Sequence, residues 1–292
     1  MGEKRILIKG VGISCFEKGK SNGNTILFLH GLGGSKREFA TLIFPLIPDC
    51  WRCVALDFPG FGASDLSKTE EHGVPLYTEI VKEYLDLFAI EKAYLFGMSM
   101  GGSVALRFGG KYPDRVAKIA AQGAPIYGKN LLTIHPALSV YEQSLRVNRA
   151  FALYSMAKTF DSLKIGVYLY PKFLLRIFKQ VVNICEIEAV TEELLEIVRK
   201  DFREARTWAI AEVIASLLEL DLTKTLQNFT IPTLILDGET AYKKPGLAST
   251  DHILSLIPTH LSRVHSIPEV GHMATILCPK EVANVTINFF ET

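Results

Sequence analysis

The 292-residue chain carries 32 Lys and Arg residues against 31 Asp and Glu residues, so its net charge is only +1. A protein this close to neutrality has no general electrostatic attraction to nucleic acid or to acidic membranes, and we expect neither as a partner. Apolar residues make up 48% of the chain and charged residues 22%, which is typical of a globular protein with a substantial core.

The sequence shows none of the signals that direct a protein to or through a membrane. Its first residues lack the apolar stretch of a signal peptide, and Ile6 stands where a myristoylation signal requires Ser or Thr. No run of about 18 apolar residues predicts a transmembrane helix. Cys50 and Cys53 form a CxxC pair, but a strand pattern follows it and no further ligands are nearby. We expect a cytoplasmic protein without a metal or another cofactor.

The predicted elements alternate between strands and helices. Two runs of alternating apolar residues come first, at 5–10 and 12–19, and predict an antiparallel pair. Continuous apolar runs, typical of strands buried on both faces of a parallel sheet, follow at 25–31, 51–57, 92–97, 116–123 and 232–238, with a last strand at 262–267. Helical patterns lie between them at 77–90, 100–113 and 279–291. This alternation predicts an α/β fold with a mostly parallel sheet.

The alternation breaks between about Ile126 and Asn228, where the apolar spacing is helical and no buried-strand pattern is present. Within this stretch Thr191 is a candidate N-cap for a helix, and the carboxylates after it suit the start of a helix dipole. We therefore predict an all-helical insertion at 126–228 on a sheet domain formed by 1–125 and 229–292.

The strongest chemical signal is the sequence Gly97-Met98-Ser99-Met100-Gly101, a G-x-S-x-G motif between a predicted strand and a predicted helix. In this context the serine sits at a sharp turn that lifts its hydroxyl clear of the sheet, and the free N–H groups of the helix start point toward it. Larger residues in place of the two glycines would collide with the neighbouring strand and helix. Ser99 is the predicted nucleophile.

Two further segments supply partners for this serine. The sequence FLHGLGGS at 28–35 ends a strand, and its Leu32 N–H is expected to join the Met100 N–H as an oxyanion hole. Removing one such donor typically costs about 3 to 4 kcal/mol of transition-state stabilisation. His272, in VGHMA at 270–274, follows the last predicted strand, and a serine followed later by a histidine is the order this motif requires. His272 is the predicted general base.

In this order, the segments HGLGGS, DFPGFGASD, GMSMGG, KYPDRV, PTLILDGE and VGH resemble the α/β-hydrolase superfamily, and within it the lid-bearing serine esterases and lipases. The resemblance spans nearly the whole chain outside the helical insertion, which corresponds to the lid. It implies an eight-stranded, mostly parallel sheet with helices on both faces, and the roles already given to Ser99 and His272. It also implies that Asp57 and Asp65 hold a structural loop and take no part in catalysis.

The acid of the triad is the part that the resemblance leaves unassigned. In the family it usually stands three residues after the glycine that ends the strand at 232–238, as in G-E-x-D, and Ala241 occupies that position here. The alternative acid loop of some relatives corresponds to AAQGAPIYG at 120–128, which has no carboxylate. Three alternatives stay open: Glu239 substitutes for the acid, Asp237 does so, or no direct acid is present.

We therefore predict a serine hydrolase that cleaves carboxylic esters through an acyl-enzyme on Ser99 and is impaired by Ala241. Its expected substrate is a small-molecule ester with an apolar acyl group. The aromatic residues of the predicted lid favour an apolar pocket: Phe151, Tyr154, Phe160, Tyr168, Tyr170, Phe173 and Phe178. A carbon–carbon bond hydrolase and a lactonase of the same fold are alternatives. An inactive homologue that binds a ligand is the alternative from another class. The missing acid favours it, and the presence of Ser99 and His272 counts against it.

Overall fold

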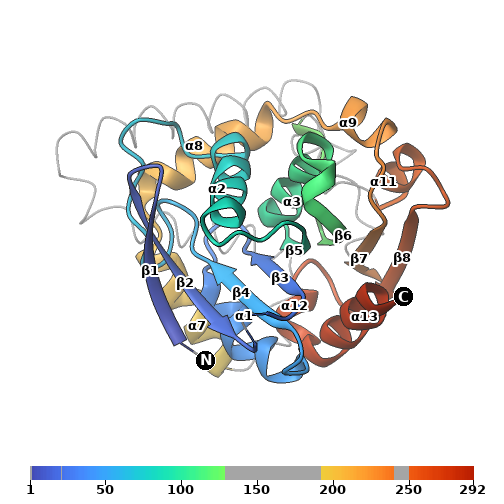
Figure 1. The fold of residues 1–292 in the computed structure, drawn as a ribbon, viewed down its shortest axis with the longest axis horizontal. Helices are drawn as coiled ribbons and strands as arrows, with labels where there is room; N and C mark the ends of the chain where they lie inside the picture. Colours follow the sequence, from blue (N-terminus) through green and yellow to red (C-terminus); the bar gives the residue numbers. More distant parts are fainter. Residues whose placement is uncertain (1, 21, 129–191, 240–249) are drawn as a thin grey trace.

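The computed structural model describes residues 2–20, 22–128, 192–239 and 250–292. Its centre is an eight-stranded sheet with the order β1-β2-β4-β3-β5-β6-β7-β8 (Figure 1). The strands are β1 (Gly2–Ile8), β2 (Val11–Lys18), β3 (Thr25–Leu29), β4 (Arg52–Leu56), β5 (Ala93–Met98), β6 (Val116–Gln122), β7 (Thr233–Gly238) and β8 (Ser262–Ile267). Strand β2 is antiparallel to both of its neighbours, and the other neighbouring strands are parallel. The predicted α/β-hydrolase sheet is confirmed.

The helices of the described residues are α1 (Lys36–Leu42), α2 (Val74–Leu87), α3 (Met100–Lys111), α7 (Glu192–Glu204), α8 (Thr207–Leu218), α9 (Thr223–Gln227), α11 (Thr250–Leu256), α12 (Ala274–Leu277) and α13 (Pro279–Glu291). The helices predicted at 100–113 and 279–291 are α3 and α13. Helix α2 begins three residues before the prediction at 77–90, because Pro75 fits its first turn, where a missing N–H costs no hydrogen bond.

Two hydrophobic cores cover the two faces of the sheet, because alternate residues of a strand point to opposite sides. On one face, Leu27, Val54 and Leu95 pack against helices α2 and α3. On the other face, Phe28 and Phe96 pack against helices α1 and α13. This double burial explains why the strands of the sequence read as continuous apolar runs.

The described part of the predicted insertion is helical, since residues 192–228 contain α7, α8 and α9. Arg37 on α1 links α7 to the sheet domain through ion pairs with Asp201 and with Glu204, the latter at 3.0 Å. Residues 129–191 lie outside the described residues, and the lid boundaries at 126–228 therefore stay a prediction. None of the helices in the described ranges is long and apolar enough to cross a membrane.

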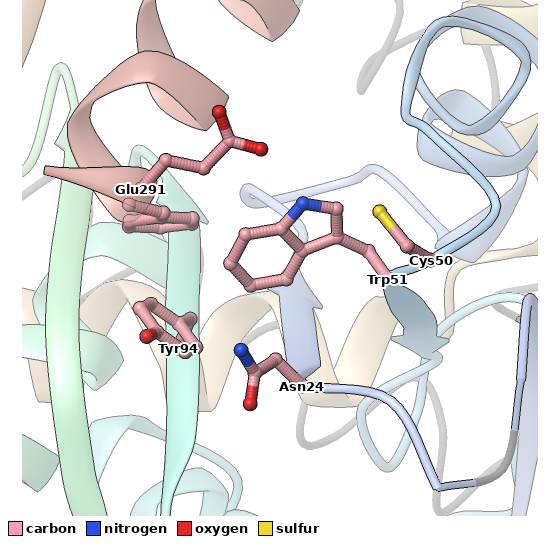
Figure 2. A pocket seen from close by; sticks show the side chains of 6 residues that line it. Asn24, Cys50, Trp51, Tyr94 and Glu291 are labelled. Atoms are coloured by element: carbon pink, nitrogen blue, oxygen red, sulfur yellow. The ribbon is translucent and has the colours of Figure 1, made fainter.

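A hollow of about 320 Å³ opens at the amino ends of β3, β4 and β5, whereas Ser99 follows the carboxyl end of β5. Figure 2 shows the side chains that line it. Its lining residues are Asn24, Cys50, Trp51, Tyr94, Phe290 and Glu291. They lie at the starts of β3, β4 and β5 and at the end of α13. The rings of Trp51 and Tyr94 pack at a centroid distance of 5.0 Å, as do those of Tyr94 and Phe290. Ligands of parallel sheets bind beyond the carboxyl ends of the strands, whereas this hollow lies at their amino ends. We therefore interpret it as a gap where α13 packs on the sheet and do not treat it as the candidate site.

Candidate active site

Ser99 lies in the sharp turn that joins β5 to α3, beyond the carboxyl end of the strand (Figure 1). Its backbone angles are φ 52° and ψ −117°, a region that residues other than glycine rarely occupy. The Ser99 N–H donates a hydrogen bond of 2.7 Å to the carbonyl oxygen of Gln122, at the end of the neighbouring strand β6. A strained residue held by the sheet at such a position is typical of a functional site.

The two glycines of the motif make this turn sterically possible. A Cβ atom on Gly97 would overlap the backbone of Gly101 and Gly102 at the start of α3. A Cβ atom on Gly101 would overlap the carbonyl of Leu29, at the end of β3. Helix α3 therefore approaches the sheet as closely as the motif requires, and its first turn begins directly at Ser99.

The loop after β3 packs directly against Ser99. A Cβ atom on Gly31 would lie 3.3 Å from the Cβ atom of Ser99, so the loop passes close to this residue. The buried His30 braces this loop, because its Nε2 accepts the Phe58 N–H at 3.0 Å and its Nδ1 donates to the Gly31 carbonyl at 2.8 Å. Leu32 follows and packs partly buried against the core. The loop is thus positioned beside the start of α3.

Asp57 holds the next loop, as the resemblance implied. Its buried carboxylate accepts the N–H of Lys36 at 2.7 Å, the Lys36 ammonium at 2.6 Å and the Ala63 N–H at 2.8 Å. Asp65 forms a 2.6 Å ion pair with Arg5 at the surface. Both carboxylates serve the architecture of the chain, and neither contacts Ser99 or His272 among the described residues.

His272 lies in the loop between β8 and α12, and its ring packs against the end of β6. A Cβ atom on Gly123 would lie 2.7 Å from both Nδ1 and Cε1 of the ring, so only glycine leaves room for the imidazole there. The Nδ1 atom is buried and has no hydrogen-bond partner among the described residues. Burial lowers the pKa of His272 to about 4, so the ring is neutral at physiological pH.

Ser99 and His272 are brought together through Gln122. Its carbonyl holds the Ser99 N–H, and its side-chain amide donates a 2.6 Å hydrogen bond to the His272 carbonyl. The structure gives no hydrogen bond between the Ser99 hydroxyl and the His272 ring among the described residues. Such bonds are often long before a substrate binds and tighten in the complex.

The loop expected to carry the acid begins at Glu239, directly after β7, and Ala241 lies outside the described residues. Asp237, a substitute acid considered from the sequence, forms its hydrogen bonds with residues other than His272. Its buried carboxylate accepts the Gly238 N–H at 3.0 Å and the Thr250 hydroxyl at 3.2 Å, and burial raises its pKa to about 6. Asp237 therefore links the end of β7 to the start of α11.

Two residues of this site, Gln122 and Gly123, were missed by sequence reasoning. Thr275 on α12, which contacts Gln122 from outside the site, was missed as well. The available signal was the polar residue Gln122 at the end of the mostly apolar segment VAKIAA. A buried amide is unfavourable unless it forms hydrogen bonds, so its presence there indicates specific partners. Thr275 gave no signal, because its partner lies 153 positions away along the chain.

The fold agrees with the comparisons to known proteins. A family model described as the alpha/beta hydrolase fold matches residues 24–180, which is more than half of the chain. The chain belongs to the alpha/beta hydrolase family. The family match includes the HGLGGS loop, the Ser99 turn and the end of β6, so the residues of the candidate site lie partly within it.

Members of this family that resemble the chain include hydrolases of two kinds. A 2-hydroxy-6-oxo-6-phenylhexa-2,4-dienoate hydrolase of Burkholderia cepacia is 26% identical over 278 residues, covering 88% of each chain. A 2-hydroxy-6-oxononadienedioate/2-hydroxy-6-oxononatrienedioate hydrolase of Klebsiella pneumoniae is 35% identical over 115 residues, 38% of this chain and 40% of the relative. Among solved structures, an esterase from Exiguobacterium antarcticum matches all of both chains with a TM-score of 0.78 at 20% identity, which shows a shared fold.

Proposed function

We propose that this alpha/beta hydrolase is a serine hydrolase that cleaves carboxylic ester bonds in small-molecule substrates. The Ser99 hydroxyl attacks the ester carbonyl while His272 takes its proton, and the Leu32 and Met100 N–H groups bind the oxyanion. His272 then returns the proton to the departing alcohol, which leaves an acyl group on Ser99. A water molecule, deprotonated by His272, releases the acid and regenerates the serine.

The single observation that carries this proposal is the pairing at the ends of β5 and β6. A serine with a strained backbone and a neutral histidine whose Nδ1 atom is buried are both anchored to Gln122. A nucleophile needs a base that is neutral at working pH, and His272 meets that condition. Met100 is the first residue of α3, where backbone N–H groups have no partner within the helix, and its N–H together with that of Leu32 is the proposed oxyanion hole.

An apolar acyl group is the substrate feature that the sequence favours, because the predicted lid is rich in aromatic residues. The fold shared with esterases is consistent with this choice. Within the proposal, residues 126–228 form the lid, and the expected acid position is Ala241, so turnover is slow. The intact Ser99 and His272 weigh against a purely ligand-binding role.

Cleavage of a carbon–carbon bond is the second candidate, and one observation favours it specifically. The relative from Burkholderia cepacia, whose match covers 88% of both chains, is named a 2-hydroxy-6-oxo-6-phenylhexa-2,4-dienoate hydrolase. Hydrolysis of that dienoate breaks a bond between two carbon atoms. The same pair, Ser99 and His272, would serve that reaction.

One substrate panel separates the two candidates. The purified chain is assayed with p-nitrophenyl esters from acetate to palmitate and with 2-hydroxy-6-oxo-6-phenylhexa-2,4-dienoate, each beside its Ser99→Ala variant. We expect ester turnover that depends on Ser99 and prefers a medium or long acyl chain. Turnover of the dienoate with no ester cleaved would favour the second candidate, and turnover unchanged by Ser99→Ala would contradict both.

The pH dependence of kcat/KM is expected to report the burial of His272. A general base works only when it is neutral, so activity is present above the pKa of His272 and is lost as the pH falls through it. Because burial lowers this pKa to about 4, kcat/KM should stay level from about pH 8 down to about pH 5 and fall below that. Circular dichroism at each pH checks that the chain stays folded. A fall centred near pH 6.5, the value of an ordinary histidine, would contradict the prediction.

A further inference from the structure

Gln122 occupies an unusual place for an amide side chain. It is the last residue of β6, in register with Met98 of β5 on one side and Leu236 of β7 on the other. Its side chain is fully buried. A buried amide without partners costs about 1 to 3 kcal/mol, so an amide at this point of the sheet requires specific hydrogen bonds.

Both ends of the amide have such partners, and they fix its orientation. Nε2 donates to the His272 carbonyl oxygen at 2.6 Å, and Oε1 accepts the Thr275 hydroxyl at 2.6 Å. A carbonyl oxygen can only accept, so the NH₂ end must face His272. Thr275 is itself fully buried, at the start of the short helix α12. The amide therefore contacts the main chain of His272 and the side chain of Thr275, three residues further along.

The His272 ring depends on its backbone for alignment, because it has few other supports. Its Nδ1 has no hydrogen-bond partner among the described residues. A histidine base is ordinarily oriented by an acid at this nitrogen. On one side Gly123, with φ 57°, leaves room for the ring, and the hydrogen bond from the Gln122 amide holds the His272 carbonyl.

The same residue also holds the nucleophile. The Gln122 carbonyl accepts the Ser99 N–H at 2.7 Å, so the main chain of Gln122 anchors Ser99 while its side chain anchors His272. A shift of either anchor changes the distance between the serine oxygen and the imidazole. Misplacement of a catalytic group by about 1 Å can cost a factor of about 10² in rate.

We propose that Gln122 is the positioning residue that aligns His272 with Ser99, acting through the hydrogen bond from its amide to the His272 carbonyl. This role rests on the proposed function of the two residues. The rival account is that Gln122 only attaches α12 to the sheet, in which case the loss of either of its side-chain hydrogen bonds should have the same effect.

Three variants separate these accounts. Gln122→Glu keeps the shape and the acceptor for Thr275, but an ionised carboxylate cannot donate to the His272 carbonyl. Gln122→Met fills the same space without polar atoms and serves if the carboxylate prevents folding. Thr275→Val is the matched control, because it removes the other hydrogen bond of the amide and leaves the bond to His272 intact.

The measurements are kcat and KM for a p-nitrophenyl ester, with the free energy of unfolding determined in urea for each variant. We expect kcat to fall by about 10 to 100-fold in both Gln122 variants with KM changed by less than about threefold, and kcat of Thr275→Val to stay within about threefold of the parent. Lowering the pH from 8 to 5 should raise kcat of Gln122→Glu relative to Gln122→Met, since a protonated carboxyl donates again.

Each outcome has a distinct meaning. If the parent chain turns the ester over through Ser99 while the Gln122 variants match Thr275→Val in kcat, the positioning role is overturned and the proposed function stands. A fall in kcat that merely parallels the loss of unfolding free energy in all three variants also overturns it. If the parent shows no Ser99-dependent turnover of the esters or the dienoate, the proposed function fails and the positioning role fails with it.

Discussion

Replacement of Ala241 by aspartate is expected to raise kcat by on the order of 10³ to 10⁴-fold with little change in KM. The acid of a triad orients the imidazole and stabilises the imidazolium that forms in the transition state, so its effect is absent from substrate binding. The buried Nδ1 of His272 has no partner among the described residues, and it is the atom to which such a carboxylate would bind. Steady-state kinetics on an activated ester measure the change.

Two further substitutions make this prediction specific. Ala241→Asn offers the shape of aspartate without its charge and should give little of the gain. The carboxylate of Ala241→Asp should also raise the pKa of His272, because a nearby negative charge favours the imidazolium. The fall of kcat/KM at low pH should therefore move from about pH 4 to a higher pH in this variant. If neither the pH of this fall nor kcat changed, the assignment of residue 241 as the acid position would be contradicted.

Glu239 is the rival for the role of the acid. If it already serves His272, Ala241→Asp should change kcat little and Glu239→Gln should remove most of the activity. If residue 241 is the vacant acid position, Glu239→Gln should leave kcat within about threefold of the parent. Should both substitutions leave an active enzyme unchanged, both accounts of the acid are wrong.

Replacement of Ser99 by alanine is expected to abolish acyl-enzyme formation, and its effect on kcat should depend on residue 241. Triad residues act as a unit, so the loss of the serine lowers kcat less in an enzyme without the acid than in one with the complete triad. In the parent chain, Ser99→Ala should lower kcat by on the order of 10²-fold. In the Ala241→Asp background the same change should cost on the order of 10⁶-fold.

The control for Ser99→Ala lies one turn further along the same helix. Ser103 is fully buried and donates its hydroxyl to the Pro125 carbonyl, so Ser103→Ala removes a hydrogen bond of α3 without removing the proposed nucleophile. It should lower the free energy of unfolding by about 1 kcal/mol and leave kcat nearly unchanged. Equal losses of kcat in the two variants would show that Ser99→Ala acts through the fold.

The strands and the Ser99 turn were predictable because each depends on local sequence. A strand buried on both faces must be apolar throughout, and the elbow needs glycine where Gly97 and Gly101 meet backbone atoms. Helix α1 was missed because its seven residues are too few to show a helical period, although Ser35 caps it through the Arg37 N–H. Short elements of this kind are fixed by capping and packing.

The supports of His272 were beyond local reasoning. Gln122 meets Thr275 across 153 positions, and the Gly123 conformation is required only because the His272 ring lies against it. Asp237 was considered as an acid from its place in the sequence alone, while the structure commits its carboxylate to Gly238 and Thr250. The orientation of a polar side chain at a strand end depends on elements that lie far away in the sequence.

The most direct test of the Ser99 and His272 pair is covalent labelling of the native chain with a fluorophosphonate, followed by intact-mass measurement and peptide mapping. A serine reacts with this reagent much faster when a neighbouring base activates it. We predict one adduct per chain, located on Ser99, formed more slowly in His272→Ala and absent from Ser99→Ala and from the chain unfolded in urea. No adduct on the native chain, or an adduct on a residue other than Ser99, would contradict the proposed mechanism.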